Sequence, residues 1–134
     1  CAESFLNAIG VSTLTSEANA IGLKNSTFMK GGGPYTTAND QALLLGMIAT
    51  GQNFSSANQQ RLLEAMKKNV FRKGIPAGVS GTVADKVGFM NGLLHDSAIV
   101  YGSHGTYVLS IMTDGASWEV IADLAKQLDA LRAQ

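Results

Sequence analysis

The chain has 134 residues, enough for one domain with a modest core. Hydrophobic residues make up 46% of it and charged residues 15%, which is typical of a globular protein and excludes a disordered one. Ten basic residues balance ten acidic ones, and this zero net charge argues against nucleic acid or an anionic membrane surface as the main partner. No apolar run approaches the length of a membrane span, so we expect no transmembrane segment.

Two helical segments are predicted near the start of the chain. The first covers residues 2–10, where Gly10 suits the position just beyond a helix end. The second covers residues 16–21 and ends at Gly22. The glycines and proline at 31–34 then predict a loop, because they break regular structure.

The first residue, Cys1, allows two interpretations. A cysteine followed by a small residue such as Ala2 is typical of a processed lipoprotein, whose mature end carries a lipid. Such an end is normally a flexible polar tether, whereas residues 2–9 have a helical pattern with Phe5 and Ile9 on one stripe. We therefore expect the chain to be a fragment of a longer protein.

Two more helices are predicted in the middle of the chain. Thr37 caps the first, and Asp40 three residues later suits the positive end of the helix dipole. The second begins at Ser55 or Ser56, which are good capping residues. The glycine- and proline-containing stretch 71–81 is predicted to be a long loop.

The periodicity changes in the last third of the chain. Residues 82–90, 97–101 and 106–113 predict three β-strands, and residues 101–106 predict a hairpin turn between the last two. Residues 117–132 carry one apolar stripe at helical spacing. The order of elements predicts an α/β or α+β fold, with antiparallel strands followed by a C-terminal helix.

One strand carries residues that suit acyl-transfer chemistry. Lys86 supplies positive charge, and Gly88 lets a substrate backbone approach closely. The next N–H group, that of Phe89, can point at a developing oxyanion. The alternative is a solvated lysine on an edge strand, and the flanking motifs favour the functional interpretation.

Five short motifs occur in an order that is fairly specific. They are GLKNST at 22–27, YTTAND at 35–40, ADKVG at 84–88, HDSAIV at 95–100 and TDG at 113–115. With the terminal helix, this order resembles the C-terminal part of the serine β-lactamase-like hydrolases, the superfamily of class A β-lactamases and penicillin-binding peptidases. The resemblance covers nearly the whole chain. It implies that fold without its N-terminal strands, with 1–81 in the helical region and 82–134 forming strands and the last helix.

The resemblance also implies roles for one motif. The family uses S-x-x-K for its nucleophile, S-D-N or S-x-N, and K-T-G on a strand that lines the site. Lys86, Val87 and Gly88 correspond to the third motif. Lys86 would help to bind the substrate carboxylate and support proton transfer, Gly88 would let the acyl group lie along the strand, and the Phe89 N–H would be an oxyanion donor. Val87 replaces a hydroxyl residue and cannot hydrogen-bond a carboxylate.

The other catalytic motifs are absent from this sequence. No Ser is followed three residues later by Lys, and Thr27, which has that spacing to Lys30, lies where the family has no nucleophile. Residues 56–58 match S-x-N in letters, but helix capping explains them better. The loop 26–36 contains no carboxylate, so we expect no efficient hydrolysis by the class A route, which uses a Glu there.

The two histidines predict no further chemistry. Adjacent strand residues point to opposite faces, so His95 and Asp96 do not form a catalytic relay with a serine. We interpret them as a structural pair at the start of a strand, and His104 as a turn residue. Two histidines without a cysteine or carboxylate cluster do not predict a metal site, and we expect no metal and no cofactor.

Two functions from different classes remain open. The resemblance implies that the complete protein is an extracytoplasmic serine hydrolase, acting through an acyl-enzyme on β-lactam or peptidoglycan-peptide substrates, and that the fragment is inactive alone. The alternative is a non-catalytic cell-wall-binding or scaffold relative, which Val87 and the carboxylate-free loop favour.

An assembly is predicted as well. Without the N-terminal strands of the family, the strand over 106–113 becomes an exposed apolar edge, which can pair with another copy. We therefore expect a homodimer or strand-swapped assembly through this strand and the 117–132 helix.

Overall fold

The computed structural model describes residues 2–28 and 34–132, so Cys1, Met29, Lys30 and most of the predicted glycine loop lie outside the described residues. The chain forms two compact units, Cys1–Leu44 and Leu45–Gln134. Helix α3 (Ala38–Thr50) begins in the first unit and ends in the second. None of the helices in the described ranges is long and apolar enough to cross a membrane.

The first unit begins with α1 (Ala2–Ile9) and α2 (Val11–Ala20). Gly10 separates them and has a φ of 87°, a left-handed conformation that glycine adopts without strain. The second helix therefore begins five residues before the predicted segment at 16–21. Its first half is rich in β-branched and hydroxyl residues, which are weak helix formers.

Hydrogen bonds to a buried carboxylate hold the loop between α2 and α3 against the start of α3. Asp40 Oδ2 accepts hydrogen bonds from the Asn25 N–H at 2.8 Å and the Ser26 hydroxyl at 2.7 Å. The bond from Ser26 is the main reason that the pKa of Asp40 is lowered. The Thr37 hydroxyl accepts from the Asp40 N–H at 3.2 Å, which confirms the predicted helix cap.

The second unit contains a three-stranded sheet and three whole helices. The Ser55 side chain caps α4 by accepting from the Asn58 N–H, so the S-x-N letters at 56–58 belong to a helix start, as predicted. The elements are α4 (Ser56–Lys67), α5 (Ile75–Gly78), β1 (Thr82–Met90), β2 (Leu93–Gly102), β3 (Gly105–Asp114) and α6 (Trp118–Arg132).

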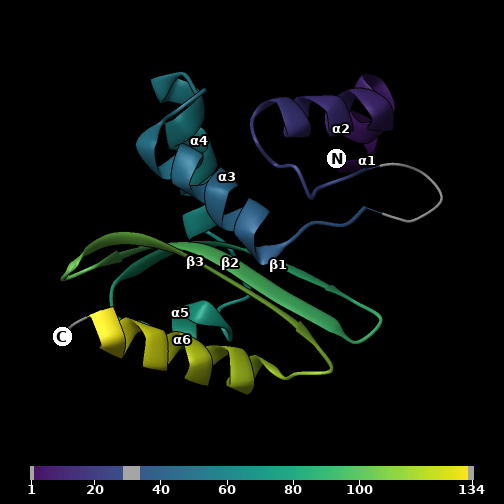
Figure 1. Cartoon of the computed structure of the whole chain (residues 1–134). Coiled ribbons are helices and arrows are strands. Elements are labelled where there is room, and N and C mark those ends of the chain that lie inside the picture. Colours follow the sequence, from purple (N-terminus) through teal and green to yellow (C-terminus); the bar gives the residue numbers. More distant parts are fainter. Residues whose placement is uncertain (1, 29–33, 133–134) are drawn as a thin grey trace. The chain divides into compact units, whose positions relative to one another are not determined.

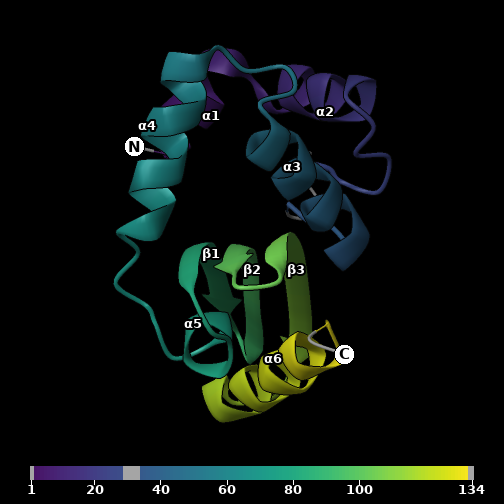
Figure 2. The same cartoon turned by 90° about the vertical axis from the view of Figure 1, so that its left-hand side faces the viewer.

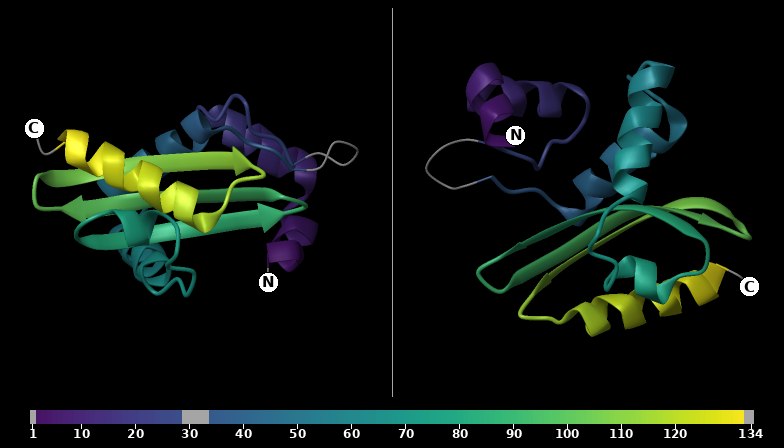
Figure 3. Two further views of the ribbon diagram at one scale, coloured as in Figure 1. Left: turned by 90° about the horizontal axis from the view of Figure 1, so that it is seen from below. Right: turned by 180° about the vertical axis from the view of Figure 1, so that it is seen from behind.

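The sheet is antiparallel in the order β1-β2-β3, with α5 and α6 on one face (Figure 1). Figure 2 shows the three strands side by side, and Figure 3 shows α6 lying across them. The core lies between the sheet and these two helices. Its buried residues are Ile75, Val83, Ala98, Val100, Ile111, Ile121 and Ala125.

Two predicted boundaries in this unit are wrong. The stretch 71–81 is not only a loop, because Ile75–Gly78 forms α5. The second strand begins at Leu93 rather than 97, because Asn91 and Gly92 make a two-residue turn directly after β1. Their φ angles of 51° and 86° are both positive, as a type I′ turn requires, and this turn is common in two-residue hairpin loops. This turn fixes the register of β1 against β2.

Candidate functional site

The predicted acyl-transfer motif lies on an edge strand of the described sheet. Strand β1 pairs with β2 on one side only, so every second backbone N–H and C=O of β1 points away from the sheet. The Lys86 ammonium donates a 2.5 Å hydrogen bond to the Val87 carbonyl. The Val83 and Asp85 carbonyls accept from the side chains of Arg72 and Asn69, which lie outside the sheet, so the Val87 carbonyl also points to the outer edge. Backbone directions repeat every second residue, so the Phe89 N–H points to the same edge.

The side chains of the motif divide between the two faces of the sheet. Lys86 and Gly88 lie on the face away from α6, while Val87 is buried on the α6 face. A Cβ on Gly88 would meet only His95 Cδ2, at 4.0 Å. The surface above Gly88 is therefore open.

Two serines lie near Lys86, but they are not arranged as a nucleophile and base. Ser97 is directly opposite Lys86 on β2, and Ser110 follows on β3. The two hydroxyls bond each other at 2.7 Å, and Ser97 is buried. The Lys86 ammonium bonds the Val87 carbonyl instead. Among the described residues, these serines therefore do not supply the missing nucleophile.

An ion pair between a buried carboxylate and a partly exposed guanidinium lies beneath the motif. Asp85 is fully buried and accepts hydrogen bonds from the Arg72 guanidinium and the Asn69 side chain. Burial raises the pKa of Asp85, and the Arg72 charge and the Asn69 bond oppose that effect. The pair ties the segment before α5 to the residue that precedes Lys86.

A second buried carboxyl lies directly across from Val87. Asp96 is the cross-strand partner of Val87 and is fully buried on the same face. Its Oδ2 accepts from the Ile75 N–H at 2.8 Å, while Oδ1 has no hydrogen-bond partner among the described residues. Burial, helped by the nearby charge of Asp85, raises the pKa of Asp96 to about 6.

Sequence reasoning missed the position of Asp96. The His95-Asp96 pair lies within β2, not at the start of a strand as predicted, and the two side chains point to opposite faces. His95 Nδ1 accepts from the Thr113 N–H at 3.2 Å. The Asn-Gly turn at 91–92 was the available signal, because it sets the pairing that brings Asp96 opposite Val87.

Aromatic side chains flank the outer end of the motif. Phe89 packs edge-to-face against Phe71, with ring centroids 5.3 Å apart, and against Trp118 at 6.4 Å. Phe89 remains 56% exposed and Met90 64% exposed. The exposed apolar surface beyond Gly88 is therefore divided between the α6 face, which carries Phe89, and the opposite face, which carries Met90.

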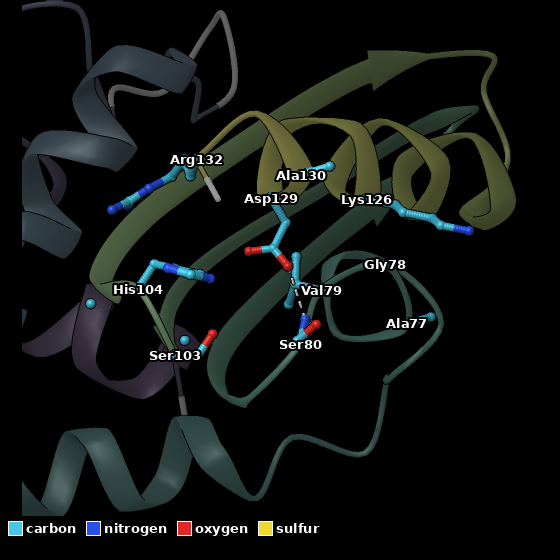
Figure 4. Close-up of a pocket in the computed structure, with 12 residues that line it drawn as sticks. Ala77, Gly78, Val79, Ser80, Ser103, His104, Lys126, Asp129, Ala130 and Arg132 are labelled. Carbon is cyan, nitrogen blue, oxygen red and sulfur yellow. Dashed lines mark hydrogen bonds between the residues drawn. The ribbon is translucent and has the colours of Figure 1, made fainter. Parts of the chain in front are cut away.

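A pocket of about 420 Å³ lies at the other end of the strands, beside the β2–β3 turn. Figure 4 shows His104 and Asp129 pointing toward one another there, while Lys126 points away. Asp129 accepts from the Ser80 N–H at 3.1 Å and the Tyr107 hydroxyl at 2.6 Å. Thr82, at this end of β1, is seven residue steps from Phe89, a distance of about 23 Å. The pocket therefore does not contribute to the motif.

Of the two histidines, one lies where it was predicted and the other, His95, lies inside β2 rather than at its start. His104 lies in the β2–β3 turn, as predicted. Within residues 2–28 and 34–132, no group of three or more His, Cys, Asp or Glu side chains could hold a metal ion.

Known proteins resemble the chain in sequence profile and in fold. The profile of the beta-lactamase enzyme family matches residues 3–131. The structure of PBP-A superposes with a TM-score of 0.80 at 24% identity, covering 91% of this chain and 51% of that one. A beta-lactamase from Sphaerobacter thermophilus gives 0.86 at 18% identity, covering 98% and 56%. No curated protein sequence matches the chain.

These likenesses bear out the predicted fold. A class A beta-lactamase variant of the last common ancestor of Gram-negative bacteria gives a TM-score of 0.84 at 20% identity, covering 96% of this chain and 58% of that one. The chain thus spans little more than half the length of these structures. Its helices and three antiparallel strands form the corresponding part of the serine β-lactamase fold. Because the family profile covers nearly all of the sequence, the chain belongs to the beta-lactamase enzyme family.

Proposed function

We propose that Lys86, Gly88 and Phe89 form the substrate-side wall of a serine acyl-transfer site. The observation that carries this proposal is the edge position of the motif, where the Lys86 ammonium and the Phe89 N–H lie at the same border of β1. Membership of the beta-lactamase enzyme family supports the reaction class. The complete protein would act through an acyl-enzyme on β-lactam or peptidoglycan-peptide substrates, outside the cytoplasm.

Each residue of the wall has a distinct role in this reaction. A serine hydroxyl from outside this sequence attacks the substrate carbonyl carbon, its proton passes to a base, and the leaving group departs with a proton. The Phe89 N–H stabilises the oxyanion of the tetrahedral intermediate. Lys86 supplies positive charge, and Gly88 leaves the space in which the acyl group lies along the strand.

Covalent labelling tests this proposal. A fluorescent penicillin should not label the purified chain, because no Ser in it has the S-x-x-K spacing. It should label a longer form that carries an upstream S-x-x-K, and Lys86→Ala should slow that labelling about 100-fold. Lys126→Ala, an exposed lysine on α6, is the control. Labelling of the chain alone, or of Lys86→Ala at the normal rate, contradicts the proposal.

The second candidate is a non-catalytic cell-wall-binding relative. Val87 favours it because the side chain offers no hydrogen bond to a substrate, and the loop 26–36 contains no carboxylate for deacylation. This candidate predicts that the chain cosediments with peptidoglycan and that no longer form is acylated. An upstream sequence with an intact S-x-x-K and normal labelling would exclude it.

We also propose that β3 mediates self-association. It is the second edge strand of the described sheet, and its residues form a regular ten-residue strand. An exposed edge of this length is a template for pairing with another chain. A homodimer or strand-swapped assembly through β3 and α6 would cover it.

A further inference from the structure

We infer that the segment between α4 and α5, together with the end of β1, docks on a membrane surface that carries anionic phospholipids. This docking surface has an apolar centre and a basic rim. The centre consists of Val70, Phe71 and Phe89, and the rim consists of Lys67, Lys68, Arg72, Lys73 and Lys86. Figure 2 shows the segment running from α4 to α5 beside β1. Docking involves no acyl transfer, so it goes beyond the function proposed above.

The charges of the chain are separated along the sequence. Residues 56–90 hold six basic and two acidic side chains, a net charge of +4, so the remaining residues carry −4. The stretch 67–73, with the sequence KKNVFRK, holds four of these basic residues and no acidic one. A zero net charge argues against an anionic partner only where the charges are evenly spread, and here they are not.

The apolar centre of the docking surface is open to solvent. Val70 is 83% exposed, more than any other large hydrophobic side chain in the described ranges. Phe71 and Phe89 are about half exposed, and their rings pack edge-to-face on each other. Exposed apolar side chains that gather at one place and are bordered by charged residues mark a surface that binds a partner.

Two carboxylates oppose the five basic residues of the rim. Asp85 is buried and bound to Arg72, and theirs is the one ion pair within residues 2–28 and 34–132. Glu119, at the start of α6, interacts electrostatically with Lys73. Five basic side chains against two carboxylates leave the docking surface with a net charge of +3.

The basic side chains lie around the apolar centre. Lys68 and Lys73 are exposed and stand on either side of Val70 in the sequence. The Lys86 ammonium bonds the Val87 carbonyl, two residues before Phe89 and therefore about 7 Å along the strand. Positive charge thus approaches the centre both from the segment and from β1.

A lipid surface fits this arrangement better than a soluble polyanion does. Apolar side chains at the centre can enter the boundary between headgroups and acyl chains, while the lysines around them keep their ammonium groups among the lipid phosphates. The attraction of each basic residue to an anionic leaflet adds to this apolar contact. A soluble polyanion would pair with the lysines but would leave Val70 and Phe71 in water.

Binding to lipid vesicles tests the inference on the chain itself. The chain should cosediment with vesicles made of equal parts phosphatidylglycerol and phosphatidylcholine, but not with phosphatidylcholine alone, and high salt should release it. Lys68→Gln combined with Lys73→Gln should weaken binding about 25-fold, or about fivefold for each lysine. The matched control is Lys24→Gln combined with Lys126→Gln, which changes the net charge equally at exposed positions outside the surface and should leave binding unchanged.

A second comparison tests the apolar centre. Val70→Ser should weaken vesicle binding about fivefold, whereas Val120→Ser, an exposed valine on α6, should not. If Val70→Ser binds like the wild type while the lysine variant binds weakly, the surface holds soluble polyanions instead, and the inference is overturned. All the substituted side chains are exposed, and thermal unfolding checks that the fold is kept. Should the lysine variant unfold early, the valine comparison decides.

The single tryptophan reports which face meets the lipid. The ring of Trp118 lies 6.4 Å from that of Phe89, so brominated lipids should quench its fluorescence when the chain binds. Absence of binding, equal binding to neutral vesicles, or binding without quenching overturns the inference. None of these results affects the penicillin-labelling test of the proposed function.

Discussion

The guanidinium of Arg72 lies over the carboxylate of Asp85, which is fully buried one residue before Lys86. Asn69 bonds the same carboxylate. The segment between α4 and α5 is thereby attached to β1 just beneath the proposed wall. We expect this attachment to hold β1 in the position that presents Lys86 at the sheet edge.

Arg72→Met should therefore destabilise the protein. It leaves the buried Asp85 carboxyl without its cation, but the Arg72 side chain is 40% exposed, so we expect a loss of about 1–3 kcal/mol. Urea unfolding followed by tryptophan fluorescence measures this loss. Arg61→Met, on the exposed side of α4, should change the free energy of unfolding by no more than about 0.5 kcal/mol. If Arg72→Met together with Asp85→Asn does not recover most of the loss, the buried charge is not its cause.

Asp96 should make stability depend on pH. Its pKa is raised from 3.8 in the unfolded chain to about 6 in the folded protein, so the folded state binds the proton more tightly. Stability should fall as the pH rises from about 4 to about 6, by about 3 kcal/mol in total. Besides burial, the backbone N–H groups of Ile75 and Ser97 and the charge of Arg72 lower the pKa of Asp96, and the charge of Asp85 raises it.

The matched variant for this titration is Asp96→Asn, which keeps an oxygen for the Ile75 N–H but cannot ionise. The difference in unfolding free energy between wild type and variant, measured from pH 3 to pH 8, should follow the predicted fall. A difference that is constant across this range would show that Asp96 does not titrate as described.

Replacing either of two glycines by alanine should change the stability of the protein, in opposite directions at the two positions. A Cβ on Gly78 would overlap the Ala122 carbonyl oxygen, whereas a Cβ on Gly46 in α3 would meet nothing within 4 Å. Gly78→Ala should destabilise by about 3 kcal/mol because α5 must move away from α6. Gly46→Ala should stabilise by about 0.5–1 kcal/mol through helix propensity. Thermal unfolding of both variants tests the pair, and equal effects would be inconsistent with the close contact at Gly78.

Association through β3 should be sensitive to charge at its edge. Light scattering at increasing concentration should show a dimer for the wild type and mainly a monomer for Val108→Lys, because a lysine on an edge strand opposes pairing. Met90→Lys, at the exposed tip of the β1–β2 hairpin, should still dimerise. A wild type that stays monomeric at high concentration contradicts the proposed interface.

The sequence predicted the strongly patterned elements well. The bounds of β1 are those expected from its residues, and the last helix begins one residue later than predicted. The prediction was less accurate where the interruption between two elements is only one or two residues long. Gly10 separates two helices without a loop, and Asn91-Gly92 joins two strands without one.

The chemical environment of the candidate site was harder to predict. The sequence predicts the strand that carries Lys86, whereas an edge position enters only as the alternative to the functional interpretation. The burial of Asp85 and Asp96 depends instead on how α5 and the segment before it pack against the sheet. A carboxylate buried by distant parts of the chain carries no local signal, and a sequence pattern does not distinguish it from a solvated one.

The hairpin order of the strands has a consequence for how the wall forms. β1, β2 and β3 are consecutive and each pairs with its neighbour in sequence, so their contacts have low sequence separation. Contacts of this kind form quickly during folding, because little chain entropy is lost in closing short loops. The sheet edge that carries Lys86 can thus assemble early, with α6 closing over it as the chain is completed. The geometry of the proposed wall would then be set early in folding, by contacts within the hairpins themselves.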